Sequence, residues 1–92
     1  MGIDMEKVVI LGSLARSFPT EILDKFKSIK GVIDADLLFG PYDFYVVAQS
    51  EEKEKLSEIA LMIRFAEGVA STITCNVVNK ETLNLVRAHS WE

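Results

Sequence analysis

The sequence of 92 residues contains one cysteine, one histidine, two prolines and five glycines. A single thiol, Cys75, excludes an internal disulfide and a zinc or iron–sulfur centre built from several cysteines. The one histidine, His89, lies in a polar stretch near the C-terminus, so we interpret it as a surface residue rather than a catalytic base or ligand. The sequence therefore predicts a protein that is not an enzyme and has no metal site and no cofactor.

Positive charge is also scarce. The chain has ten Lys and Arg and fourteen Asp and Glu, and its formal net charge is -4. Binding to nucleic acid phosphates needs a basic surface, so nucleic acid is disfavoured as a direct partner. No apolar run approaches the ~18 to 20 residues that span a bilayer, and the acidic start does not resemble a signal peptide. These absences predict a cytoplasmic protein that binds neither membrane nor DNA directly.

Apolar residues make up 49% of the chain and charged residues 26%, which is enough apolar material for one small domain. We expect this domain over residues 7–79, between an N-terminal extension, 1–6, and a C-terminal tail, 80–92. The length excludes a second domain, because single domains cluster near ~100 to 150 residues and much shorter chains struggle to bury a core.

Four segments are predicted to be strands, namely 7–14, 32–39, 44–48 and 69–78. The first and third are apolar at successive positions, which is typical of strands that are buried on both faces. The second and fourth alternate apolar and polar residues, which is typical of half-exposed strands. The apolar sets of these two strands are Ile33, Ala35, Leu37 and Phe39 in the second and Ile73, Cys75 and Val77 in the fourth. This alternation favours Cys75 as a small core residue.

The polar set of the second strand includes Asp34 and Asp36, which share a face. Such a pair is found at a divalent-cation or acid–base site, and also on edge strands that charge keeps soluble. We favour the edge-strand interpretation.

Two helices are predicted between the strands. The first begins at Pro19, whose missing N–H costs nothing at a helix start, and ends at Gly31. The second is capped by Ser50 and ends at Gly68. The order β-α-β-β-α-β predicts an α+β, ferredoxin-like fold, with a four-stranded antiparallel sheet and both helices on one face.

The other face of such a sheet is uncovered. Alternate residues of the two apolar strands, Val8 or Val9 and Tyr45 and Val47 or their neighbours, must point that way. The resulting apolar patch would exceed what a monomer usually exposes. We therefore expect a dimer in which two sheets pack face to face.

A turn of Gly40, Pro41, Tyr42 and Asp43 separates the second and third strands. Gly40 permits close approach of a ligand or a second backbone, Pro41 presets φ, and Asp43 can accept from N–H groups or a cation. By itself this stretch is an ordinary hairpin turn.

Residues 7–78 as a whole resemble the effector (RAM) domain of the Lrp/AsnC family. The residues that carry the resemblance are Pro19, Ile29-Lys30-Gly31-Val32, Gly40-Pro41-Tyr42-Asp43-Phe44 and Glu67-Gly68-Val69-Ala70-Ser71-Thr72. The resemblance implies a homodimer, often assembled into rings, with an amino acid bound where dimers meet near the hairpin. The ligand-binding residues that it implies are Gly40, Pro41, Tyr42, Asp43, Ser71 and Thr72.

Two departures from the family pattern bear on function. The family's regulators carry a DNA-binding helix-turn-helix domain, and only six residues precede the first strand here, so we expect a stand-alone RAM protein that acts through full-length regulators of the family. Pro41 stands where the family often has an acidic residue, and it removes a backbone N–H. The alternatives are a dimeric ferredoxin-like enzyme of the monooxygenase type and a structural oligomer without a ligand.

Overall fold

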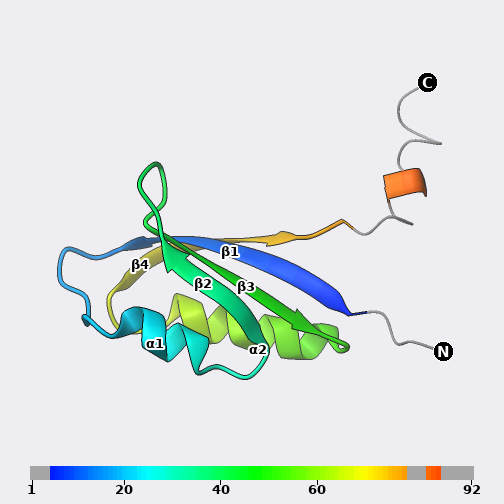
Figure 1. Ribbon diagram of the computed structural model, residues 1–92, viewed down its shortest axis with the longest axis horizontal. Helices are drawn as coiled ribbons and strands as arrows, with labels where there is room; N and C mark the ends of the chain where they lie inside the picture. Colours follow the sequence, from blue (N-terminus) through cyan, green and yellow to red (C-terminus); the bar gives the residue numbers. More distant parts are fainter. Residues whose placement is uncertain (1–4, 79–82, 86–92) are drawn as a thin grey trace.

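Six helices and strands follow one another in the predicted order (Figure 1). The computed structural model describes residues 5–78 and 83–85. The strands are β1 (Glu6–Leu14), β2 (Val32–Leu37), β3 (Phe44–Ser50) and β4 (Val69–Asn76), and the helices are α1 (Ile22–Lys27) and α2 (Lys53–Arg64). His89 lies outside the described residues, as do most of the tail and the first four residues.

The four strands form one antiparallel sheet in the order β2-β3-β1-β4. The predicted central positions of the first and third strands are therefore confirmed. Both helices lie against one face of the sheet, and the loop between β2 and β3 rises from the opposite side (Figure 1). We call the uncovered side the open face.

The core lies between the sheet and the helices. The buried side chains are Val8, Ile10, Ile22, Phe26, Ala35, Phe44, Val46, Ala48, Leu56, Ile59 and Ile63. Complete burial of one such large side chain stabilises a fold by about 1.5–3 kcal/mol. The Phe26 and Phe44 rings meet with centroids 5.0 Å apart, and a Cβ at Gly12 would overlap the Phe44 ring. Glycine at position 12 thus lets Phe44 lie across β1.

Both predicted helix starts were wrong. Helix α1 begins at Ile22, after a turn in which the Ile22 N–H donates to the Pro19 carbonyl at 3.1 Å. It ends at Lys27 rather than near Gly31. Ser50 is the last residue of β3, where it pairs with Glu6 across the ladder, so Glu52 takes the N-cap position. The Ser50 hydroxyl instead accepts the Glu52 N–H at 3.1 Å.

The predicted apolar face of the second strand was only partly right. Of its four residues, Ala35 alone is buried. The register shifts between Val32 and Asp34, which leaves Ile33 exposed at the irregularity. Strand β2 ends at Leu37, so Phe39 lies in the loop beyond it.

The assignment of Cys75 to the core was wrong, because its thiol is exposed. Cys75 lies opposite Val9, and Thr74 lies opposite the buried Ile10. Residues directly opposite in antiparallel strands share a face, so the polar set of β4 faces the helix layer and the apolar set faces the open side. Strand β4 ends at Asn76, two residues before the predicted boundary at Val78.

Candidate functional site

The loop between β2 and β3, residues 38–43, is fastened to the end of β1 by Asp43. The Asp43 Oδ2 accepts the Leu14 N–H at 2.7 Å, and the Asp43 N–H donates to the Gly12 carbonyl at 2.8 Å. The Asp43 carbonyl accepts the Leu38 N–H, also at 2.8 Å. Asp43 therefore connects the hairpin to a strand 29 residues away in the sequence, rather than capping its own turn.

The tip of the hairpin is open to solvent. Gly40 has φ +147°, and apart from its own atoms and those of its two chain neighbours nothing lies within 4 Å of where its Cβ would be. Pro41 is exposed and Tyr42 is half-buried. Among the described residues, no partner is found for the N–H of Gly40 or Tyr42. Two backbone donors and the Asp43 carboxylate are thus grouped at the loop, although one carboxylate oxygen already binds Leu14.

Ser71 and Thr72 lie one strand away from the hairpin base. Gly12 pairs with Phe44 on one side and with Thr72 on the other, so the two family-like motifs meet at Gly12. Thr72 shares the face of Gly12 and points to the helix layer, whereas Ser71 belongs to the open side. Of these two residues, Ser71 is therefore the one on the open face. The hairpin rises from the same side of the sheet (Figure 1).

The open face is apolar along its centre and acidic at one edge. The apolar side chains are Val9, Leu11, Val47, Ile73 and Cys75. Asp34 and Asp36, at the β2 edge, lie opposite Val47 and Tyr45. The Tyr45 hydroxyl donates to Asp34 Oδ2 at 2.7 Å.

This hydrogen bond alters the titration of Tyr45. It raises the pKa of Tyr45 above the ordinary value of 10.0, and partial desolvation and the negative charges of Asp34 and Asp36 raise it further. The cause is that ionisation would remove the donated proton and place a phenolate beside two carboxylates.

Asp34→Asn should lower the pKa of Tyr45, because an amide oxygen is a weaker acceptor and carries no net charge. Tyr42→Phe leaves Tyr45 as the only tyrosine, so near-ultraviolet absorbance of tyrosinate reports it alone. Because folding raises the Tyr45 pKa, its contribution to stability should be present below pH 10 and lost as the pH rises through the raised pKa. If the pKa of Tyr45 is the same in Tyr42→Phe and in the double variant that also carries Asp34→Asn, the hydrogen bond to Asp34 is not what raises it.

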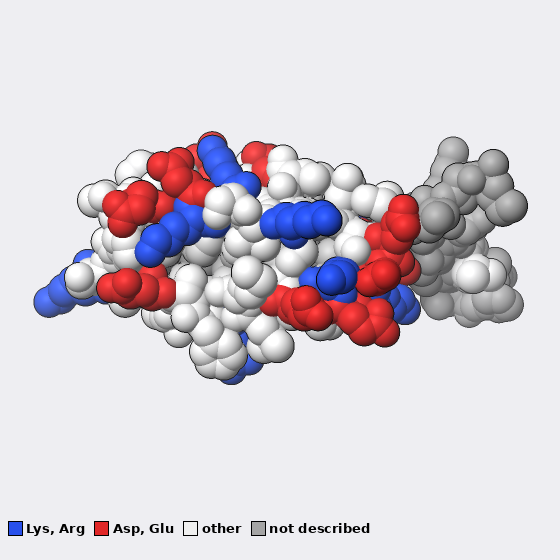
Figure 2. All heavy atoms as spheres, turned by 90° about the horizontal axis from the view of Figure 1, so that it is seen from below, with Lys and Arg blue, Asp and Glu red and all other residues white. Residues whose placement is uncertain are grey.

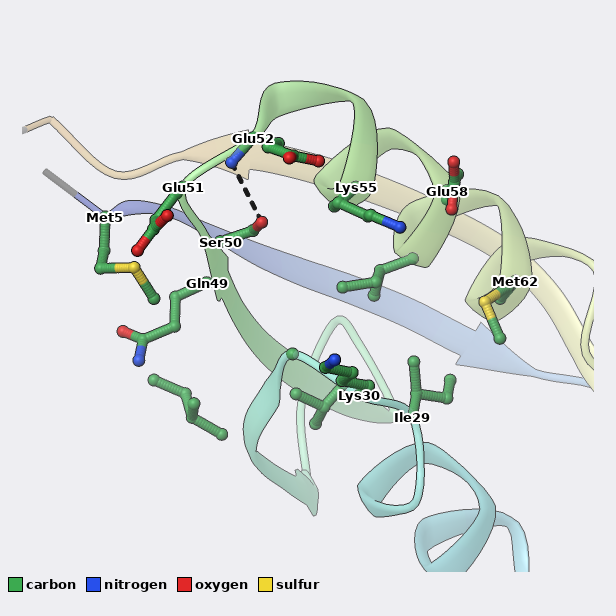
Figure 3. A pocket seen from close by; sticks show the side chains of 14 residues that line it. Met5, Ile29, Lys30, Gln49, Ser50, Glu51, Glu52, Lys55, Glu58 and Met62 are labelled. Carbon is green, nitrogen blue, oxygen red and sulfur yellow. Dashed lines mark hydrogen bonds between the residues drawn. The ribbon is translucent and has the colours of Figure 1, made fainter. Parts of the chain in front are cut away.

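A groove of about 680 Å³ that no sequence pattern indicated is shown in Figure 3. It is lined at the start of β2 and the end of β3, so it lies at the opposite end of the sheet from the hairpin. It lies between the α1–β2 turn, the end of β3 and one side of α2. Its apolar lining comes from Met5, Ile29, Val32, Ile33, Ile59 and Met62. Lys30, Lys55 and three glutamates surround this lining, so neither sign of charge dominates. The lining residues come from separate segments, which is why no local motif indicates the groove.

Other kinds of site find little support in the part of the chain that the structure describes. Its residues include no group of three or more His, Cys, Asp and Glu that could hold a metal ion. Basic and acidic side chains are interspersed over the helix side, without a broad basic patch (Figure 2). No helix among the described residues is long and apolar enough to cross a membrane.

No protein-family model and no curated protein matches the chain. Solved structures do. FFRP-DM1 superposes with a TM-score of 0.70 and 23% identity, covering 79% of this chain and 99% of that one. E. coli AsnC superposes with a TM-score of 0.69 and 23% identity, and the match covers 86% of this chain and 54% of AsnC. The transcriptional regulator NMB0573 of Neisseria meningitidis, in complex with L-Met, superposes with a TM-score of 0.68 and 15% identity. This match covers 82% of this chain and 51% of NMB0573.

The chain thus corresponds to nearly all of FFRP-DM1 and to about half of each of the two regulators. The α+β topology that the sequence predicts is the topology that these structures share with it. This protein therefore has the ferredoxin-like fold found in the transcriptional regulators of the Lrp/AsnC family.

Proposed function

We propose that this chain is a stand-alone, RAM-like module that binds an amino acid and self-associates. In this proposal it acts in the cytoplasm, without catalysis, and modulates transcription or amino-acid metabolism through full-length regulators of the Lrp/AsnC family. The observation that carries the proposal is the hairpin at Gly40–Asp43, which Asp43 fixes to β1 while the N–H groups of Gly40 and Tyr42 have no partner among the described residues.

The chemistry of this hairpin suits a zwitterion. An amino acid needs an acceptor for its ammonium group and donors for its carboxylate. Asp43 supplies the acceptor, and the N–H groups of Gly40 and Tyr42, with the Ser71 hydroxyl, supply the donors. The L-Met complex of NMB0573, a protein of the same fold, supports this class of ligand.

Self-association follows from the open face. Ile73 is 48% exposed and Cys75 is also exposed, and both lie beside the half-buried Val9 and Leu11. A patch of this kind is typical of surfaces that bind a partner. A second copy supplies a matching apolar sheet, so we propose a homodimer with the two sheets face to face, from which a ring of dimers is built. The hairpin stands beside this face, and its tip at Gly40 and Pro41 is exposed on a single copy. In this proposal a neighbouring copy covers the tip and completes the ligand site where dimers meet.

A thermal-shift screen against the twenty common amino acids tests this function. A ligand that binds only the folded protein stabilises it by about 2.7 kcal/mol at a hundred times its Kd, so at least one amino acid should raise Tm. D-enantiomers serve as controls, because a site with fixed donors and acceptors distinguishes them. A screen in which no amino acid raises Tm would contradict ligand binding and favour the structural oligomer.

A further inference from the structure

Phe39 is the most exposed large apolar side chain among the described residues, with a relative exposure of 109%. It lies at the hairpin tip, next to Leu38, which is also exposed. A phenylalanine ring buries roughly 150 to 250 Å² when it is covered, so full exposure is costly unless a partner covers it. Neither the core nor the groove at the opposite end of the sheet provides that cover.

The loop that carries Phe39 has a fixed base. Three hydrogen bonds hold it, from Leu14 N to Asp43 Oδ2, from Asp43 N to the Gly12 carbonyl and from Leu38 N to the Asp43 carbonyl. The loop rises from the open face, away from both helices (Figure 1). Phe39 is thus presented on the side of the sheet where the apolar patch lies.

We propose that the hairpin is a clasp, in which Phe39 packs onto a second copy of this chain bound to the open face. This inference rests on the proposed face-to-face dimer and assigns a role to a residue that the fold does not use. A second copy is the occupant because Phe39 lies on the same side as the apolar open face, so one partner covers both. By two-fold symmetry the dimer would contain two such clasps, one from each copy.

Phe39→Ser tests the clasp in the full chain. Truncation of an aromatic anchor at an interface typically costs at least 2 kcal/mol, so the dimer Kd should rise about 30-fold. Phe65→Ser is the matched control, because Phe65 is 76% exposed but lies just after α2, in the helix layer. Its dimer Kd should equal that of the wild type. Sedimentation equilibrium measures all three values, and circular dichroism checks that each variant is folded.

A fluorescent reporter gives a second measurement. Trp91→Phe removes the one native tryptophan, and Phe39→Trp then places a single indole at the tip. Its emission should shift to shorter wavelength as dilute protein is concentrated into the dimer range, because the partner excludes water from the ring. The same protein carrying Val9→Lys, which prevents packing of the open face, should show no shift.

The outcomes separate the clasp from the dimer itself. A wild type that stays monomeric would overturn both proposals. A dimer that Val9→Lys abolishes, but whose Kd Phe39→Ser leaves unchanged, would overturn the clasp alone. A Phe39→Trp reporter whose emission in the dimer stays that of a solvent-exposed indole would also overturn the clasp.

Discussion

Val9→Lys should leave this protein monomeric at concentrations at which the wild type is a dimer. Val9 lies in the middle of the open face, opposite Val47 on β3 and Cys75 on β4. A lysine there would be buried in the proposed interface with no acidic residue opposite it. Leaving a buried charge without a partner costs about 3 to 5 kcal/mol, which weakens a dimer at least a hundredfold. Light scattering coupled to size-exclusion chromatography measures the change in mass.

The structure shows why position 9 is a better choice than position 47 or 45. All three side chains belong to the open face. Asp34 lies opposite Val47 and Asp36 lies opposite Tyr45, so a lysine at either position would find a carboxylate partner within its own sheet. Val47→Lys should therefore weaken the dimer less than Val9→Lys does.

Leu61→Lys is the control for Val9→Lys, because it adds the same charge at a 52% exposed position of α2. It should not change the mass in solution. The lone thiol provides an independent measurement, since Cys75 is exposed on a single copy and lies opposite Val9. A thiol reagent should modify Val9→Lys faster than the wild type. A Val9→Lys protein that is still a dimer, with an equally protected Cys75, would show that the open face is not the interface.

Asp43→Ala should lower stability and abolish ligand binding, whereas Asp43→Asn should affect mainly binding. Alanine removes the acceptor of the Leu14 N–H, and hydrogen bonds to charged groups contribute about 1.5–3 kcal/mol. Asparagine retains an oxygen for Leu14 but loses the negative charge that a ligand ammonium requires. Chemical denaturation at one fixed protein concentration measures stability, and calorimetry with the amino acid found in the thermal-shift screen measures affinity.

Lys55→Gln provides the control for the location of the ligand. Lys55 lines the groove at the other end of the sheet, where apolar and charged side chains also lie together (Figure 3). This variant should bind the ligand as the wild type does. If Asp43→Asn instead binds normally and Lys55→Gln does not, Asp43 has only a structural role and the ligand occupies the groove.

Local sequence patterns were enough to predict the order of the elements and which strands are central. The strands with successive apolar residues, β1 and β3, were expected at the centre of the sheet, with a neighbouring strand along each edge. The sheet order confirms this. Both predictions depend on local patterns, because alternating residues and apolar runs reflect which faces of a segment are buried and which face water. The same patterns indicated a turn at Gly40–Asp43, although not the direction in which it rises.

The face that each alternating set takes, and the partners of Asp43, depend on how the chain folds in three dimensions. A period of two says that Cys75 and Thr74 point to opposite sides, but pairing with β1 determines that Cys75 faces outward. The bond between Asp43 and Leu14, the exposure of Phe39 and the groove all depend on segments far apart in the chain. The register of the sheet brings these segments together, and a shift of one residue would turn every side chain of a strand to the other face.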